Sequence, residues 1–496
     1  MLMPAGKANV QPSFVYNHKT MRRTLPRATG PVLLLALASI AVTLIAAASR
    51  MPASDPRMKS SYRRAPRDGW TLVHLEGTPA EIGYQHGVLL SREIKDGFEV
   101  QKLELMHDSH KPWEFYRDAA RTVLWPHIPG EYREELQGIS DGLKSAGISL
   151  DIWDITALNA AEEWSYYIEQ YDKEHGIKTP KAVTAPDHCS AFVATGSYTK
   201  DGKFVIAHNN WTSYLDGPRW TIAFDITPAQ GHHFLMDGFP GFIHSGDDFG
   251  VNDAGIVITE TTITGFKGWD SNGTAEFARA RKAMQYSESI DDFARIMKEG
   301  NNGGYANDWL VADTKTNEVA SLELGLRNVE LKRTKDGYFT GANFPINEKL
   351  LHEETDFNAT DPGLSSNARR VRWEQLMREN KGRIDSNLAR RFLADHYDTV
   401  AKKDQPSERT LCGHVDLSVR GMGDWKAPYD PAGAVQNKVA DAAMASKMTF
   451  VAAAGHACGL NFKAKEHLDK YPQFAWQSPL LEDMNAHKWT RIHARP

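Results

Sequence analysis

Cys189 is the residue of this sequence best suited to act as a nucleophile. It lies in Asp187-His188-Cys189-Ser190, after a proline-containing loop and at the start of a β-rich run. A thiol attacks carbonyl carbons readily near neutral pH, but only as the thiolate. A chain break before Cys189 would free an α-amine with a pKa of about 8, which can act as the base. Spacing alone also allows a plainer interpretation, in which Cys189 is a small buried hydrophobic residue.

Ser140 is a second candidate nucleophile. It is the serine of Gly138-Ile139-Ser140-Asp141-Gly142, which matches the G-x-S-x-G pattern of serine hydrolases. That pattern requires a strand before the serine and a sharp turn at it. Helical spacing instead relates the neighbouring apolar residues Tyr132, Leu136, Ile139 and Leu143. We therefore expect Ser140 to lie within a structural helix.

The remaining cysteines and histidines predict neither a metal site nor a cofactor. The sequence has three cysteines, so a four-cysteine zinc site is excluded. Cys412 and Cys458 could pair in an exported protein or could both stay buried and reduced. His232 and His233 have no third ligand at metal spacing, and no H-E-x-x-H occurs. Phosphate-binding and dinucleotide-binding glycine patterns are absent as well.

The first 67 residues are expected to lie outside the catalytic fold. Residues 1–30 are basic, residues 31–48 carry no charge, and Ala46-Ala47-Ala48 ends the apolar run. This order is typical of a cleaved secretory signal peptide. The run is also close to the minimum for a spanning helix, so an uncleaved membrane anchor is the alternative. We expect an exported protein (periplasmic, secreted or luminal), with residues 49–67 as a linker.

The rest of the chain changes from helical to β-rich near Cys189. Residues 68–188 form a predicted helical segment, in which Thr78 and Glu81 fit the capping box that begins a helix. Residues 189–496 contain short β-rich runs separated by turn signals, with helices among them. Hairpins of this kind favour antiparallel pairing. The sequence therefore predicts an α+β layered architecture with largely antiparallel sheets.

Composition limits the classes of partner. The chain is 41% hydrophobic and 24% charged, which is ordinary for a globular protein with a large core. Its formal net charge is −5, so no basic excess indicates a nucleic-acid partner.

Several blocks of the sequence resemble the phospholipase B-like proteins. The blocks are Cys189–Val193, His208–Tyr214, Gly241–Phe249, Glu260–Thr262 and Asn301–Trp309. Upstream, Glu76–Gly87 is similar to the penicillin acyltransferase-like group of self-cleaving proteins. Both groups belong to the N-terminal nucleophile (Ntn) hydrolases. The resemblance covers about residues 70 to 460 and is most specific between Cys189 and Thr262.

The resemblance implies a fold, a processing step and a reaction. The fold is a four-layer αββα sandwich. Self-cleavage falls between His188 and Cys189, so that residues 68–188 become an alpha chain and residues 189–496 a beta chain. The freed Cys189 then hydrolyses acyl amide or ester bonds.

The resemblance also implies roles for individual residues. Cys189 matches the nucleophile, and His208 and Asn209 fall at the end of the strand that pairs with it. Asn307 matches an asparagine whose amide helps to form the oxyanion hole, a task suited to a neutral donor. Arg369 resembles a late site arginine, although Arg370 and Arg372 are close enough to blur the alignment.

Four further residues are candidates for supporting the site. Trp211 stands where choloylglycine-type relatives carry an aspartate, so the role of that aspartate cannot be transferred. Asp247 and Asp248 are expected in a hairpin turn, or else to orient the site. Glu260 ends a β-rich run and could point into the site or pair with an arginine.

Two functional classes remain open at this point. The first is an autoproteolytic cysteine hydrolase or acyltransferase that acts on acylated small molecules, peptides or lipids, including phospholipids as a lipid deacylase. We favour amide bonds, because relatives with an N-terminal cysteine mostly cleave amides. The second is a catalytically degenerate acyl- or lipid-binding protein of the same fold, which the residue at Trp211 would suit. Membrane contact through residues 31–48 is the expectation if that segment is an anchor.

Overall fold

The computed structural model describes residues 55–180, 189–247, 249–423 and 426–494. The predicted basic region, signal or anchor segment and most of the linker, residues 1–54, lie outside these ranges, as do His188 and Asp248. Residues 56–63 belong to the fold: a short 3-10 turn at Pro56–Met58 leads into a first strand. Within the described ranges, no helix combines the length and apolar character that a bilayer crossing requires.

The larger of the two main sheets has nine strands and follows an almost regular antiparallel order. Its one parallel pair within the described residues joins β2 and β5. The strands in spatial order are β1 (Tyr62–Arg63), β2 (Thr71–Gly77), β5 (Ile222–Pro228), β6 (Phe234–Gly238), β7 (Gly250–Asn252), β8 (Ile256–Thr262), β9 (Asn307–Asp313), β10 (Glu318–Leu324) and β11 (Val329–Thr334).

The second sheet has six antiparallel strands. The first of these along the sequence is the strand that follows Cys189. Its strands in spatial order are β12 (Gly337–Gly341), β3 (Ser190–Thr195), β4 (Val205–Ser213), β15 (Ala432–Asp441), β16 (Thr449–Ala454) and β17 (Thr490–His493). A separate small ribbon pairs β13 (Tyr397–Asp398) with β14 (Lys403–Asp404).

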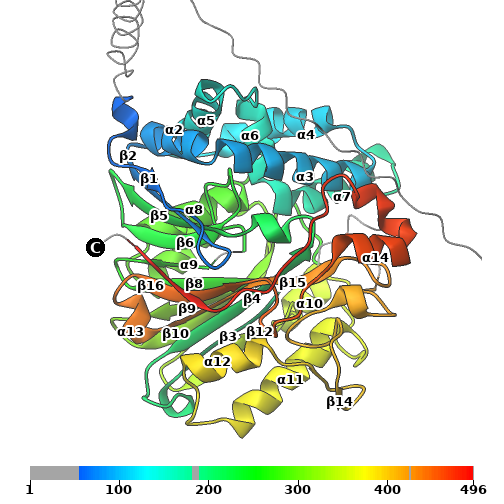
Figure 1. Ribbon diagram of the computed structural model, residues 1–496. Coiled ribbons are helices and arrows are strands. Elements are labelled where there is room, and N and C mark those ends of the chain that lie inside the picture. The colour runs from blue at the N-terminus through cyan, green and yellow to red at the C-terminus, as the bar shows by residue number, and fades with distance from the viewer. Residues whose placement is uncertain (1–54, 181–188, 248, 424–425, 495–496) are drawn as a thin grey trace, which may run out of the picture. The chain divides into compact units, whose positions relative to one another are not determined.

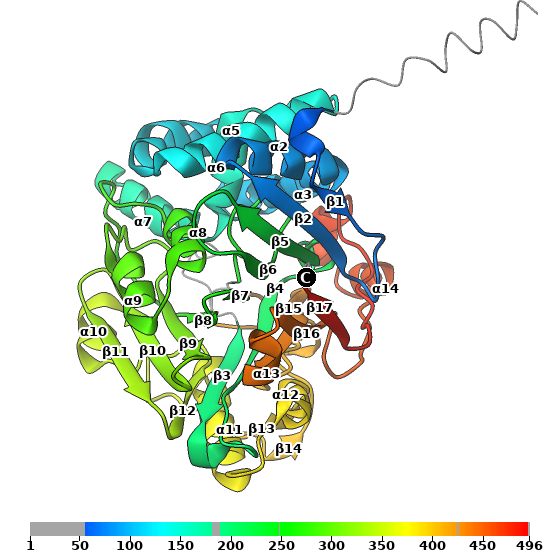
Figure 2. The same cartoon turned by 90° about the vertical axis from the view of Figure 1, so that its left-hand side faces the viewer.

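Helices cover the outer face of each sheet, so that four layers are stacked (Figures 1 and 2). The nine-stranded sheet is covered by α2 (Pro79–Leu89), α3 (Ser91–Ser109), α4 (Trp113–Ala119), α5 (Gly130–Ser145), α6 (Ile152–Asn159), α7 (Trp164–His175), α8 (Glu276–Tyr286) and α9 (Ile290–Lys298). The six-stranded sheet is covered by α11 (Ser365–Glu379) and α12 (Ser386–Leu393). The shorter helices are α10 (Glu348–Glu354), α13 (Ala442–Ala445) and α14 (Ala464–Lys470).

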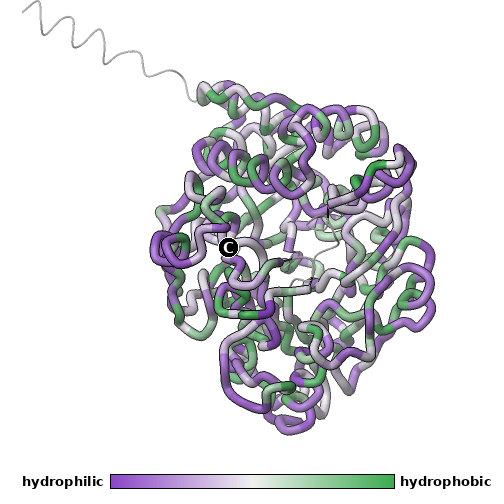
Figure 3. Tube along the Cα trace, turned by 90° about the vertical axis from the view of Figure 1, so that its right-hand side faces the viewer, coloured by the Kyte–Doolittle hydropathy of each residue, from purple (hydrophilic) through white to green (hydrophobic). Residues whose placement is uncertain are grey.

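Alternation along the strands separates the core between the sheets from the cores under the helices. On β3, Ala191 and Val193 pack between the two sheets, whereas Phe192 and Ala194 pack under α11 and α12. Successive side chains of a strand point to opposite faces, so one strand supplies both cores. The outer helices alternate between hydrophilic and hydrophobic residues, as expected for helices with one buried face (Figure 3). The predicted αββα layered architecture is therefore confirmed.

Ser140 lies in the middle of α5, as expected, and its hydroxyl donates to the carbonyl of Leu150 at 3.0 Å. The glycines of the G-x-S-x-G pattern, Gly138 and Gly142, have a packing role instead. A Cβ on Gly138 would lie 2.5 Å from the carbonyl oxygen of Ala80, and a Cβ on Gly142 would lie 2.4 Å from that of Tyr84. The four-residue spacing of the glycines lets the backbones of α2 and α5 touch.

The close contact between α2 and α5 predicts a large difference between two glycine-to-alanine variants. A Cβ on Gly83 of α2 would lie 1.9 Å from the carbonyl oxygen of Glu135, which is backbone and cannot turn away. We expect Gly83→Ala to lower the free energy of unfolding in urea by about 1–3 kcal/mol. The control is Gly130→Ala at the start of α5, where nothing lies within 4 Å of the added carbon. Equal stability of the two variants would contradict this packing.

Candidate functional site

The β3–β4 hairpin brings Cys189 and His208 together. Cys189 immediately precedes β3, and β3 pairs with β4 so that Ser190 lies opposite Asn209 and Ala191 opposite His208. The thiol of Cys189 contacts the amide oxygen of Asn210 at 3.9 Å. Cys189 has a φ of +74°, a left-handed backbone conformation that residues other than glycine rarely adopt. Such strain persists only where neighbouring contacts hold it, and it is concentrated at functional sites.

A thiol, an imidazole and a carboxylate meet at this point. The Sγ atom of Cys189, a ring nitrogen of His208 and a carboxylate oxygen of Glu260 all lie within 4.8 Å of one another. Cys189 is only 1% exposed. Burial, with the Glu260 carboxylate as a further cause, raises the pKa of the Cys189 thiol well above its usual value. The thiol is therefore protonated, and it is closed off from solvent.

His208 is held neutral in the same place. Burial lowers the pKa of its imidazole well below the usual value, and the positive charge of Lys438 acts in the same direction. Neither ring nitrogen has a hydrogen-bond partner among the described residues. A neutral imidazole with both nitrogens unused can accept or relay a proton once a substrate or water enters.

Arg369 of α11 forms hydrogen bonds with the residues at the start of β3. One guanidinium nitrogen donates to the carbonyl of Cys189 and, at 3.2 Å, to the hydroxyl of Ser190, and the other terminal nitrogen donates to the Asn343 side chain at 3.0 Å. The guanidinium also stacks over the ring of Trp211, with its carbon 4.4 Å from the ring centroid.

The neighbouring arginines do not share this position. Arg372 pairs with Asp395 at 2.6 Å, and Arg370 lies over the ring of Phe344. The ambiguity that the sequence leaves among the three arginines is thus removed, since Arg369 alone of the three is placed against Cys189.

Asn307 is the first residue of β9 and is completely buried. Thr262 lies opposite Asn307, and Glu260 lies opposite Trp309. Residues two apart on a strand share a face, as do directly opposed residues, so Asn307 and Glu260 are diagonal neighbours on one face of the sheet. Neither atom of the Asn307 amide has a hydrogen-bond partner among the described residues. An amide that is buried and unused is unusual, because leaving it without partners costs free energy.

A buried charge cluster links the two sheets beside the thiol. Lys438 of β15 pairs with Asp237 of β6 at 2.8 Å and also with Asp247, and Gln436 donates to both carboxylates at 2.7 and 2.5 Å. Burial, together with the nearby Asp237 carboxylate, raises the pKa of Asp247 to about 7. Asp247 lies in the connection between the antiparallel strands β6 and β7. It is buried there beside the Lys438 cation, which comes from a strand of the other sheet.

Asn209 and Trp211 lie on the other face of β4 from His208. Asn209 donates to the carbonyls of Leu393 and Leu411, at 2.9 and 2.7 Å. Its side chain therefore fastens the helical layer to the strand and does not approach the thiol. The sequence grouped Asn209 with His208 because they are adjacent, whereas strand alternation separates them.

Sequence reasoning missed Lys438, Asp237, Asn343 and Asn210. A usable signal existed for the first two, since each is a charged residue inside an apolar β-run, next to Val439 and Met236 respectively. Buried charges survive only when they are paired, so such residues indicate a partner. Asn343 and Asn210 carried no comparable signal.

Comparisons with known proteins identify the family of the chain. The phospholipase B family matches residues 122–491. Phospholipase B of Crotalus adamanteus is 24% identical over 409 residues, covering 74% of this chain and 70% of that protein. An uncharacterized protein of Archaeoglobus fulgidus is 28% identical over 285 residues, 53% of this chain and 44% of that protein. Phospholipase B-like 1 of Homo sapiens is 24% identical over 295 residues, 54% of this chain and 51% of that protein.

The chain thus spans about half the length of the archaeal and human relatives. Among solved structures, a mutant of the conjugated bile acid hydrolase of Clostridium perfringens matches with a TM-score of 0.29 and 9% identity, over 53% of this chain and 88% of that one. That likeness is too weak to carry an argument. The family match, however, extends over most of the chain and includes each site residue from Cys189 to Lys438, so the chain belongs to the phospholipase B family.

Proposed function

We propose that this protein is an exported cysteine hydrolase of the N-terminal nucleophile type, which cuts its own chain before Cys189 and then hydrolyses acyl bonds. Membership in the phospholipase B family supports a hydrolase. The observation that carries the proposal is the meeting of a buried thiol, a neutral imidazole and the Glu260 carboxylate at the start of β3. Titratable groups with shifted pKa values that meet in one buried place are characteristic of reaction centres.

The proposed scission begins with attack of the Cys189 sulfur on the carbonyl carbon of residue 188. The peptide bond breaks, the α-amine of Cys189 leaves with the thiol proton, and a thioester forms. Water then hydrolyses the thioester, which returns the thiol and leaves a carboxylate on residue 188. Two observations support this step: the left-handed φ of Cys189 and the hydrogen bond from Arg369 to its carbonyl. Both fix the backbone next to the peptide bond that is cut.

After scission the free α-amine of Cys189 serves as the base. It takes the thiol proton, the sulfur attacks an acyl carbonyl, and the negative charge that develops on the carbonyl oxygen needs a donor. The Asn307 amide suits this task, because its nitrogen is buried and has no hydrogen-bond partner among the described residues. The leaving amine or alcohol departs with the proton, and water or an acceptor amine resolves the S-acyl enzyme.

Two substrate classes remain candidates. The family favours an acyl ester of a phospholipid, whereas the N-terminal cysteine device favours an acyl amide, which is our preference. The alternative function is a degenerate acyl- or lipid-binding protein, for which the observation is Trp211, whose ring is occupied by the Arg369 guanidinium. Hydrolysis separates the two functions, because a binding protein takes up the same acyl chains without releasing product.

We expect Cys189→Ala to abolish hydrolysis of both N-acyl amides and phospholipids, with acyl-chain release falling to the background without enzyme. The variant lacks the sulfur that attacks in either reaction. The matched control is Ser140→Ala, which removes the hydroxyl of the serine-hydrolase pattern and is expected to keep wild-type turnover. Activity that survives Cys189→Ala and is lost in Ser140→Ala would contradict the cysteine mechanism.

We expect Asn307→Ala to lower kcat by about 10²–10³-fold with little change in KM, because an oxyanion-hole donor acts mainly in the transition state. Asn307→Asp should be no better, since it replaces the donor with a negative acceptor of equal size. The control is Asn272→Ala, an exposed asparagine. Steady-state kinetics of the cleaved enzyme would contradict the assignment if kcat of Asn307→Ala matched the wild type.

A further inference from the structure

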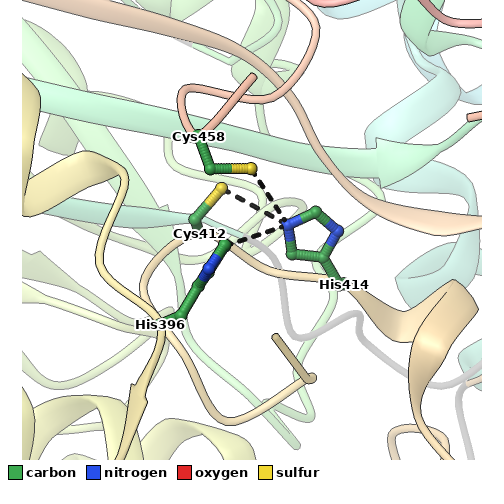
Figure 4. A group of neighbouring side chains, drawn as sticks. All are labelled: His396, Cys412, His414 and Cys458. Atoms are coloured by element: carbon green, nitrogen blue, oxygen red, sulfur yellow. Dashed lines mark hydrogen bonds between the residues drawn. The ribbon is translucent and has the colours of Figure 1, made fainter. Parts of the chain in front are cut away.

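Two histidines and two cysteines meet away from the Cys189 thiol, where three loops come together (Figure 4). His396 follows α12, Cys412 and His414 lie in the loop before β15, and Cys458 follows β16. One potential ligand atom from each of the four residues lies within 4.8 Å of the other three. Two imidazoles and two thiolates form a ligand set that proteins use to hold Zn²⁺.

Three separations, all measured from the Nε2 atom of His414, match edges of a tetrahedron around an ion. With Zn–N of about 2.0–2.1 Å, Zn–S of about 2.3 Å and tetrahedral angles, two nitrogens stand about 3.3–3.4 Å apart, and a nitrogen and a sulfur stand about 3.5–3.6 Å apart. The Nε2 atoms of His396 and His414 are 3.2 Å apart. The Nε2 atom of His414 is 3.6 Å from the sulfur of Cys412 and 3.5 Å from that of Cys458.

Hydrogen bonding alone does not account for this convergence. Three polar atoms approach the Nε2 atom of His414, as the dashed lines in Figure 4 show. An imidazole nitrogen has either one proton to donate or one lone pair to accept, so it cannot satisfy all three contacts. A cation at the centre satisfies all four residues at once, because each then directs a lone pair inward.

Burial and charge also fit a bound divalent ion. Cys412 and His414 are buried at 0% and 1% exposure, whereas His396 and Cys458 are partly exposed and leave a path of entry. Two thiolates neutralise a divalent cation, so the loaded site carries no net charge into the protein. Behind His414, its Nδ1 atom faces the Asp416 carboxylate at 3.8 Å, on the side where metal-binding histidines commonly have a carboxylate.

We propose that His396, Cys412, His414 and Cys458 bind one Zn²⁺ ion. Four protein ligands complete a tetrahedron and leave no position open for a substrate, so the site is structural and not catalytic. The ion would join three loops that are distant in sequence, since His396 and Cys458 lie 18 and 44 residues from His414.

The same loop supports the strand that carries His208. Gly413, between the two ligands of the loop, lies so close to Trp211 that an added Cβ would be 2.2 Å from the indole ring. The carbonyl of Leu411 accepts the Asn209 amide at 2.7 Å. A metal that fixes this loop therefore braces the outer face of β4, behind the thiol, without contact with the thiol.

The test measures zinc bound to the full-length protein, purified without an affinity tag for metals and without chelator. We expect about one zinc per chain by elemental mass spectrometry, and a loss of more than about tenfold in both His396→Ala and Cys458→Ser. Cys189→Ser and His352→Ala, a cysteine and an exposed histidine outside the cluster, should keep the full content. Replacement by Co²⁺ should give the visible bands of a tetrahedral site and a thiolate-to-metal charge-transfer band.

The wild-type protein itself provides a control for effects on folding. Removal of the metal with a chelator should lower the midpoint of thermal unfolding, and added Zn²⁺, but not Mg²⁺, should restore it. Circular dichroism of each variant shows whether a loss of zinc is merely a loss of fold.

Four results would overturn the proposal. The first is wild-type zinc content in both folded ligand variants. The second is loss of zinc in Cys189→Ser, which assigns the metal to Cys189, His208 and Glu260. The third is a mass deficit of two hydrogens between Cys412 and Cys458, which shows a disulfide. The fourth is a reduced wild-type protein that binds no added Zn²⁺.

Discussion

One buried guanidinium joins the backbone of Cys189 to the layer of helices outside the six-stranded sheet. Burying a charged group is costly unless hydrogen bonds satisfy it. Arg369 meets this requirement by donating to the carbonyl of Cys189, the hydroxyl of Ser190 and the side chain of Asn343, while its flat face rests on Trp211. Those contacts hold Cys189 in a left-handed conformation, at the point where β3 enters the core between the sheets.

The two sheets supply opposite sides of the site. The six-stranded sheet provides His208 and Lys438, and the nine-stranded sheet provides Glu260, with Asn307 as its diagonal neighbour on the next strand. Lys438 joins the sheets through its pairing with Asp237, so the spacing between the sheets is fixed by a charge contact as well as by apolar packing. Separating the two partners of such a pair would leave an uncompensated buried charge. The two sheets are therefore held together at this point.

Much of the fold could be predicted from local sequence signals. Contacts between residues that are distant in the sequence could not. The capping box of Thr78 and Glu81 and the helix around Ser140 follow from short-range spacing and are confirmed. Asn209 was grouped with His208 because strand alternation was not applied to the pair. The contact between Asp247 and Lys438 spans 191 residues, and no spacing rule predicts it. The cluster around His414 was missed for the same reason: its ligands come from three loops, so the sequence holds no metal-binding motif.

The central claim is that Cys189 becomes the first residue of a new chain. The intact mass of the exported wild-type protein, measured under denaturing conditions, tests it most directly. The account predicts two species, one of which has the mass of residues 189–496 and an unmodified cysteine at its N-terminus. A single unbroken chain that spans residue 188 and still hydrolyses acyl substrates at the wild-type rate would contradict the account.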